Sequence, residues 1–128
     1  MRDVNETPGS AREKEIKLIY FSSLAVMNMG NSRYMAHKLT MEDLVLTVPR
    51  NLVIRLGNIT WGTNPHTLIN YLRANPDAEI ADEYRYITTK EAFLHWTFLA
   101  KNEKGIFNLI GETLKVQEIA DRIKRGEL

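Results

Sequence analysis

The stretch Leu18-Ile-Tyr-Phe-Ser-Ser23 decides the fold that the rest of the chain follows. Its first four residues are apolar or aromatic, which is typical of a short strand buried on both faces of a sheet. A similar run, Asn51-Leu-Val-Ile-Arg-Leu56, ends at Gly57. Asn31 or Ser32 offers an N-cap for a helix between the two runs, reaching to about Val48 before Pro49. Strand, helix and strand in this order predict a βαβ unit with parallel strands.

Weaker sequence patterns occur before this unit and within it. A short helix capped by Ser10 is predicted to reach Ile16, and residues 24–31 are predicted to form a loop because they contain glycine and two asparagines. On the long helix, the 3.6-residue period places Met35, Leu39, Glu42 and Leu46 on one flank. This spacing indicates a helix.

The second half of the chain is organised differently. Asn64-Pro65 predicts a helix start, and Asn75-Pro76 predicts its end after Ala74. Four further elements are predicted from their residue patterns. They are a strand at 84–88, a threonine-capped helix at 92–100, a strand at 105–111 and a helix at 116–125. We therefore expect one α/β domain, with a partial Rossmann-like parallel sheet in residues 1–62 and a small α+β region in residues 63–128.

Composition excludes several classes of protein. With 128 residues, 44% hydrophobic and 26% charged, the chain has the size and make-up of one globular domain. The net charge of +1 gives no electrostatic footprint for nucleic acid or membrane, and the run Arg122-Ile-Lys-Arg125 is interpreted as cations at a helix C-terminus. No cysteine is present, and the three histidines are scattered, so no metal site is predicted. Without a long apolar run, the chain is expected to be cytoplasmic.

The chemistry of the chain centres on Tyr34 and Lys38. Residues four apart on a helix face the same way, so the ammonium of Lys38 can stabilise the phenolate of Tyr34 and let it exchange a proton. Ser23, at the carboxyl end of a strand, can hydrogen-bond the same substrate oxygen. The competing interpretation of the spacing is a half-buried tyrosine beside a solvated lysine.

The order of three segments makes this chain resemble a known family. Leu18–Ser23, Tyr34–Lys38 and Arg55–Gly62 occur in the order found in the extended short-chain dehydrogenase/reductase family, and the chain is most similar to its NAD-dependent epimerase/dehydratase branch. Three downstream segments extend the resemblance over nearly the whole chain: Tyr84–Ala92, Gly105–Gly111 and Lys115–Ala120. Members of this branch act mostly on nucleotide-linked sugars.

The resemblance implies roles for individual residues. Ser23 would orient the substrate oxygen and Tyr34 would act as the acid/base. Lys38 would stabilise the phenolate and bind the ribose of the nicotinamide, with the cofactor being NAD or NADP. The backbone at Leu56 and Gly57 would lie beside the nicotinamide. These roles make Ser23, Tyr34 and Lys38 the predicted catalytic residues.

Two polar residues near the second strand remain open to more than one interpretation. Asn58 stands where the family often has a substrate-contacting asparagine, and it is equally well interpreted as a turn residue after a strand. Arg55 is interpreted as a structural ion-pair partner or a site residue.

The departures from the family pattern are also informative. No glycine-rich turn of G-x-G-x-x-G type is present, although family members use one to bind the pyrophosphate at a helix N-terminus. The chain therefore resembles only the C-terminal portion of such an enzyme. The segment from Ser23 to Tyr34 is short for this branch, and Thr89 replaces a common aspartate.

An absent half leaves the strand at Leu18 to Phe21 with an open edge, which invites association. We expect that edge to be covered by a second copy, by a separate nucleotide-binding half, or by residues 1–16.

Two functions follow from the sequence. One is the catalytic and substrate-binding portion of a nucleotide-sugar epimerase, dehydratase or reductase. The other is a non-catalytic remnant that binds a sugar nucleotide or a partner.

Overall fold

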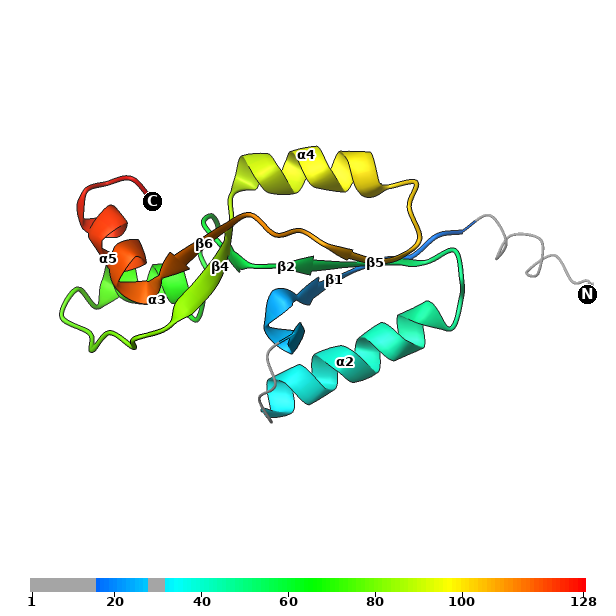
Figure 1. Cartoon of the computed structure of the whole chain (residues 1–128), viewed down its shortest axis with the longest axis horizontal. Coiled ribbons are helices and arrows are strands. Elements are labelled where there is room, and N and C mark those ends of the chain that lie inside the picture. The colour runs from blue at the N-terminus through cyan, green and yellow to red at the C-terminus, as the bar shows by residue number, and fades with distance from the viewer. Residues whose placement is uncertain (1–15, 28–31) are drawn as a thin grey trace, which may run out of the picture.

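A computed structural model of the chain describes residues 16–27 and 32–128 (Figure 1). The predicted short helix from Ser10 to Ile16 and the predicted cover formed by residues 1–16 lie outside this range except for Ile16. Residues 28–31 of the predicted loop also lie outside it. Within the described residues, two three-stranded sheets follow one another along the molecule, each with its own helices.

The first sheet contains the predicted βαβ unit. Its strands are β1 (Ile19–Ser23), β2 (Leu52–Leu56) and β5 (Gly105–Asn108), in the order β1-β2-β5 and all parallel. The central strand is fully covered, because Leu52, Val53 and Ile54 have no exposed surface. A strand covered on both faces explains the unbroken apolar run that the sequence shows there.

Helices cover the two faces of this sheet. Helix α2 (Arg33–Leu46) packs against β1 and β2 on one face, and α4 (Lys90–Ala100) lies on the other (Figure 1). The core under α4 consists of four buried residues with partly buried hydrophobic residues around them: Leu52, Ile54, Ala100 and Leu109. Thr89 caps α4 by accepting a hydrogen bond from the Ala92 amide at 3.1 Å, so the threonine cap predicted from the sequence is confirmed.

Helix α2 forms where the sequence predicted a helix. Ser32 is its N-cap, accepting from the Met35 amide at 3.1 Å, and the helix ends at Leu46. Its buried residues are Glu42 and Val45, whereas Leu39, which shares a flank with Glu42 in the sequence pattern, is 41% exposed. Glu42 is buried because it pairs with an arginine on β2.

The second sheet lies beyond the carboxyl ends of β1 and β2. It consists of β3 (Asn58–Ile59), β4 (Tyr84–Thr88) and β6 (Glu112–Lys115), with β3 parallel and β6 antiparallel to β4. Helices α3 (Leu68–Ala74) and α5 (Val116–Lys124) cover it. Five buried residues form this second core: Ile69, Leu72, Ile87, Val116 and Ile119.

The structure differs from the sequence predictions at three places along the chain. Helix α3 begins at Leu68 and not at Pro65, because Asn64 forms a turn with the His66 amide and Thr67 supplies the cap. The strand predicted at 105–111 ends at Asn108, and the separate strand β6 that follows Gly111 was not predicted. Leu24–Met27, within the predicted loop, forms a 3₁₀ helix.

The chain passes from the first sheet to the second through two glycines. Gly57 joins β2 to β3, and Gly111 precedes β6. A Cβ at Gly57 would lie 2.8 Å from the carbonyl carbon and oxygen of Tyr86, and one at Gly111 would lie 2.5 Å from the carbonyl oxygen of Ile87. Both contacts are with the backbone of β4, so only glycine allows the two sheets to approach this closely.

We predict that Gly57→Ala destabilises the chain by about 1–3 kcal/mol, because the methyl group must push β4 away. Urea unfolding followed by circular dichroism measures this change. Gly126→Ala is the matched control, since nothing lies within 4 Å of its Cβ position and only its φ of +75° opposes alanine. A Gly57→Ala variant as stable as the wild type would contradict the close approach of the sheets.

Candidate functional site

A cavity of about 890 Å³ opens where the first sheet ends and the second begins. Parallel strands place ligands beyond their carboxyl ends, and β1 and β2 both end at this cavity. Every residue that the sequence predicted for the site lines it: Ser23, Tyr34, Lys38, Leu56, Gly57 and Asn58. Four elements, β1, α2, β2 and β3, therefore bring the predicted residues to one place.

Helix α2 contributes the predicted acid/base pair. Tyr34 is 55% exposed, and the ammonium of Lys38 lies 5.7 Å from the centroid of its ring. The same ammonium lies 5.2 Å from the ring centroid of Tyr20 on β1. Lys38 is therefore close to Tyr34, as the spacing of four residues predicted. A second ring, that of Tyr20, contacts the ammonium from the side of β1.

Ser23 ends β1 and begins the next turn of the chain. Its hydroxyl oxygen accepts a hydrogen bond from the Ala25 amide at 3.0 Å, at the start of the 3₁₀ helix. This bond fixes the serine at the wall of the cavity. The hydroxyl proton is not used by that bond, so Ser23 can still donate to a ligand oxygen.

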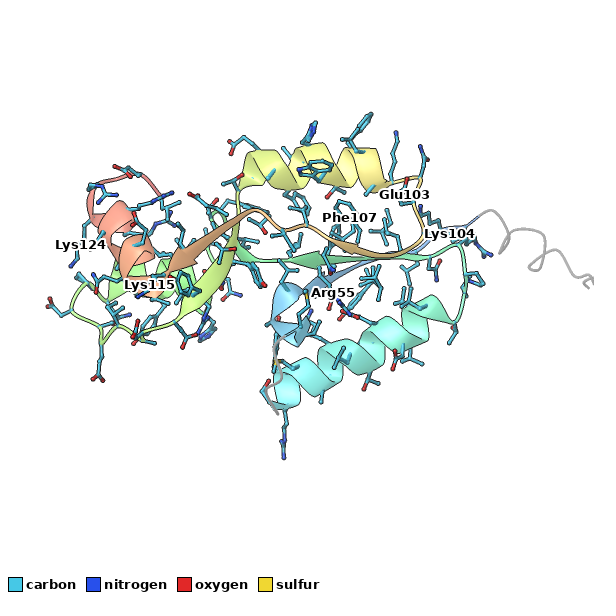
Figure 2. All side chains as sticks on the ribbon, viewed as in Figure 1. Arg55, Glu103, Lys104, Phe107, Lys115 and Lys124 are labelled. Atoms are coloured by element: carbon cyan, nitrogen blue, oxygen red, sulfur yellow. The ribbon has the colours of Figure 1, made fainter. Side chains whose placement is uncertain are left out.

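A buried ion pair ties α2 to β2. Arg55 donates to Glu42 through Nε at 3.0 Å and through Nη2 at 2.7 Å, and the Glu42 side chain is only 2% exposed. Figure 2 shows Arg55 on the side of the sheet that faces α2. The interpretation of Arg55 as an ion-pair partner is therefore confirmed. A two-point contact of this kind fixes orientation as well as distance.

The environment of Glu42 favours its ionised form. Burial alone would raise the pKa of the Glu42 carboxyl, but the hydrogen bonds from Arg55, the nearby Ser22 side chain, and the charges of Arg55 and Lys38 bring the pKa below its ordinary value. Ser22 is 5% exposed and lies on β1. The carboxylate is thus charged at neutral pH and holds Arg55 in place.

Asn58 and Gly57 are engaged with β4. The Asn58 side-chain amide donates to the Tyr86 carbonyl at 2.9 Å, and the Gly57 amide donates to the Thr88 hydroxyl at 2.8 Å. These bonds fix the wall of the cavity and give Asn58 a structural role, but at the start of β3 and not as the turn residue of one interpretation. Its predicted contact with substrate stays a prediction.

The far wall of the cavity was not predicted as part of the site. It comes from the second sheet and the turn before α3, through Tyr84, Arg85, Thr113 and His66. Tyr20, which does not line the cavity but contacts Lys38, was also missed, although its position two residues before Ser22 puts it on the same face of β1. The strand period would have indicated Tyr20, whereas nothing in the sequence indicates which second-sheet residues reach the cavity.

The basic run near the C-terminus is paired with acidic groups. Arg122 contacts Glu112 and Glu118, and Arg125 contacts Glu127, which raises the pKa of both arginines through hydrogen bonding. The described ranges contain no cluster of three histidine or acidic residues suited to a metal ion. No helix in the part of the chain that the structure describes is long and apolar enough to cross a membrane.

The residues present fit one end of a nicotinamide cofactor. Tyr34 and Lys38 offer a hydroxyl and an ammonium to a ribose, and the backbone of Leu56 and Gly57 forms the adjacent wall. The phosphate end is different, because the sequence has no glycine-rich turn leading into a helix. A cofactor would therefore need further phosphate ligands from outside these residues.

Solved structures share this fold, although no family model and no curated protein matches the sequence. A Bordetella bronchiseptica enzyme, WbmG, in complex with NAD and UDP has a TM-score of 0.73 and 18% identity over 93% of this chain. ADP-L-glycero-D-manno-heptose-6-epimerase from Helicobacter pylori has a TM-score of 0.66 and 22% identity over 90%. dTDP-glucose 4,6-dehydratase from Bacillus anthracis, in complex with NAD, has a TM-score of 0.69 and 16% identity over 90%.

These structural neighbours confirm the predicted fold class. They include a heptose 6-epimerase and a glucose 4,6-dehydratase, and two of the three were solved with NAD. The chain spans about half of their length, with 46% of WbmG and 47% of the heptose epimerase covered. This coverage agrees with the expected C-terminal portion of a longer enzyme. At sequence identities of 15–22%, these structures show a shared fold but do not assign roles to the site residues.

We predict that Glu42→Gln destabilises the chain by about 3 kcal/mol at pH 7, because it leaves the Arg55 charge without its partner. Since the pKa of Glu42 is lowered by folding, its stabilising effect is present above the unfolded-state pKa and is lost as the pH falls through the folded-state value. The wild type should therefore lose more stability than the variant on acidification below about pH 4.5.

Urea unfolding at several pH values measures both effects. Asp43→Asn is the matched control, because Asp43 is the exposed neighbour of Glu42 on the same helix. Equal stability losses for the Glu42 and Asp43 variants would contradict the buried pair.

Proposed function

We propose that this chain is the catalytic and substrate-binding portion of a cytoplasmic NAD(P)-dependent enzyme that acts on a nucleotide-linked sugar as an epimerase, dehydratase or reductase. The observation that carries the proposal is that Ser23, Tyr34 and Lys38, from a strand end and a helix, line one cavity. The fold shared with NAD-dependent epimerases and dehydratases agrees with this chemistry.

Each residue has a distinct task in the proposed reaction. The cofactor, when bound, accepts or returns a hydride at a sugar carbon. Tyr34 takes the proton from the sugar hydroxyl, or returns it to the carbonyl oxygen, at that same position. Lys38 stabilises the phenolate during this exchange, and Ser23 donates a hydrogen bond to the sugar oxygen so that it faces Tyr34.

The proposed enzyme also requires a nucleotide-binding half. The first sheet has only three strands in the described residues, and β1 is an outer strand whose Phe21 is 38% exposed. The outward side of α4 is apolar as well, with Leu94 57% and Phe98 64% exposed. Parallel sheets normally bury both faces, so we propose that a separate half carrying the phosphate-binding turn, or a second copy, covers this surface.

The alternative function is a non-catalytic module that binds a sugar nucleotide or a partner. Its support is that contacts within the protein alone form the wall of the cavity on the side of the second sheet. Asn58 and Gly57 are bonded to β4, and Tyr84 and Arg85 face the same space. A module of this kind would bind UDP and would give no response to NADH.

We predict that the chain binds NADH weakly and that Lys38→Met weakens the binding about tenfold, because a charged hydrogen-bond donor to the ribose is lost. Nicotinamide fluorescence during titration measures the affinity. Lys104→Met is the matched control, since Lys104 is exposed in the turn before β5, away from the cavity (Figure 2). No response at millimolar NADH would contradict cofactor binding by the chain and would favour the module.

We also predict that the chain associates as its concentration rises and that Phe98→Glu reduces this association. The introduced charge would be buried without a partner when the α4 surface is covered. Sedimentation velocity over a concentration series measures the effect, and Leu44→Glu is the control, because Leu44 is 59% exposed on α2. A monodisperse monomer at every concentration, with no partner added, would contradict association through the α4 surface.

A further inference from the structure

The ammonium of Lys38 is held by aromatic rings. Among the residues that the structure describes, no carboxylate lies within 4.0 Å of it, whereas Arg55 and Arg122 each have an acidic partner. Its two nearest aromatic groups are Tyr20, at 5.2 Å from the ring centroid, and Tyr34, at 5.7 Å. A cation within about 6 Å of a ring face is attracted by the negative charge of the π-system.

Tyr20 reaches Lys38 because of its place in β1. Side chains alternate between the faces of a strand, so Tyr20 and Ser22 point to the face covered by α2. Ser22 lies by Glu42, and Tyr20 lies by Lys38, one helical turn earlier on α2. Two successive residues on this face of the strand thus contact two successive turns of the helix.

The charged groups around Lys38 do not hold it in place by themselves. Glu42 is the nearest acidic group on α2, four residues on, and both of its oxygens are taken by Arg55. Arg55 approaches from β2 and repels a second cation. A lysine has a long flexible stem and samples many conformations when no group fixes its end. The ring of Tyr20 is therefore the group that restrains the ammonium on the β1 side.

We propose that Tyr20 is a positioning residue, whose ring holds the ammonium of Lys38 beside the ring of Tyr34 before any ligand enters the cavity. Its use in catalysis rests on the proposed function, whereas the contact itself rests on the geometry. The contact pre-orders the cation at the wall of the cavity, so a cofactor ribose or a phenolate meets a charge that is already in place.

Nuclear magnetic resonance of the free chain tests this contact without any cofactor. A ring face shifts the resonances of protons above it upfield, so the ε-methylene protons of Lys38 should be shifted from those of exposed lysines. Tyr20→Leu should remove the greater part of that shift, and Tyr20→Phe, which keeps the ring, should retain it. Tyr71→Leu is the matched control, because Tyr71 is 49% exposed on α3 and does not line the cavity.

Three results would overturn the proposal. They are an unchanged Lys38 resonance in Tyr20→Leu, a lost shift in Tyr20→Phe, and the absence of nuclear Overhauser effects between the Lys38 ε-methylene and the Tyr20 ring in the wild type. The last measurement needs no variant, so it decides the matter even if Tyr20→Leu does not fold. If the contact is found and NADH does not bind, the proposed function fails while the positioning role of Tyr20 toward Lys38 stands.

Discussion

The ion pair between Glu42 and Arg55 is the interaction on which the site depends. Helix α2 has few buried apolar residues, so apolar packing alone gives it little reason to adopt one rotation over another. Two hydrogen bonds from Arg55, buried between the helix and β2, select one rotation. That rotation directs Lys38 toward Tyr20 and places Tyr34 at the cavity. Charge is thus used here to specify geometry, at a cost in desolvation that the pairing offsets.

A second constraint is the close contact between the two sheets. Gly57 and Gly111 allow β2 and the segment after β5 to run against the backbone of β4, which a side chain at either position would prevent. The cavity lies at this junction, with Ser23 and Lys38 on the first sheet's side and Tyr84 on the second's. One wall therefore carries the proton-transfer residues, and the other is free to contact a different part of a ligand.

The fold was predictable where apolar runs and caps are strong, and less so elsewhere. Both runs, at Leu18 and at Asn51, form parallel strands as predicted. The run at Asn51 does so as a central strand buried on both faces, which has little choice of residues. The run at Leu18 was expected to be buried on both faces as well, but β1 is an outer strand and its Phe21 is 38% exposed. The pattern placed Glu42 on one flank of α2, but it did not indicate that this glutamate is buried, since its partner Arg55 lies on another element. The start of α3 was missed because Asn64 and Thr67 are both good caps and the local turn decides between them. The six predicted site residues all line the cavity, but Tyr20 was absent from the prediction because its role depends on a contact between β1 and α2.

The proposed function requires that the nucleotide-linked sugar binds in the same cavity that the proton-transfer residues line. The most direct test follows the backbone amide resonances of the free chain during titration with UDP, the nucleotide present in one structural neighbour. The account predicts that the resonances of Ser23, Lys38 and Gly57 shift together while that of Asp121 on α5, away from the cavity, stays unchanged. Shifts confined to residues outside the cavity, or none at millimolar UDP, would contradict it.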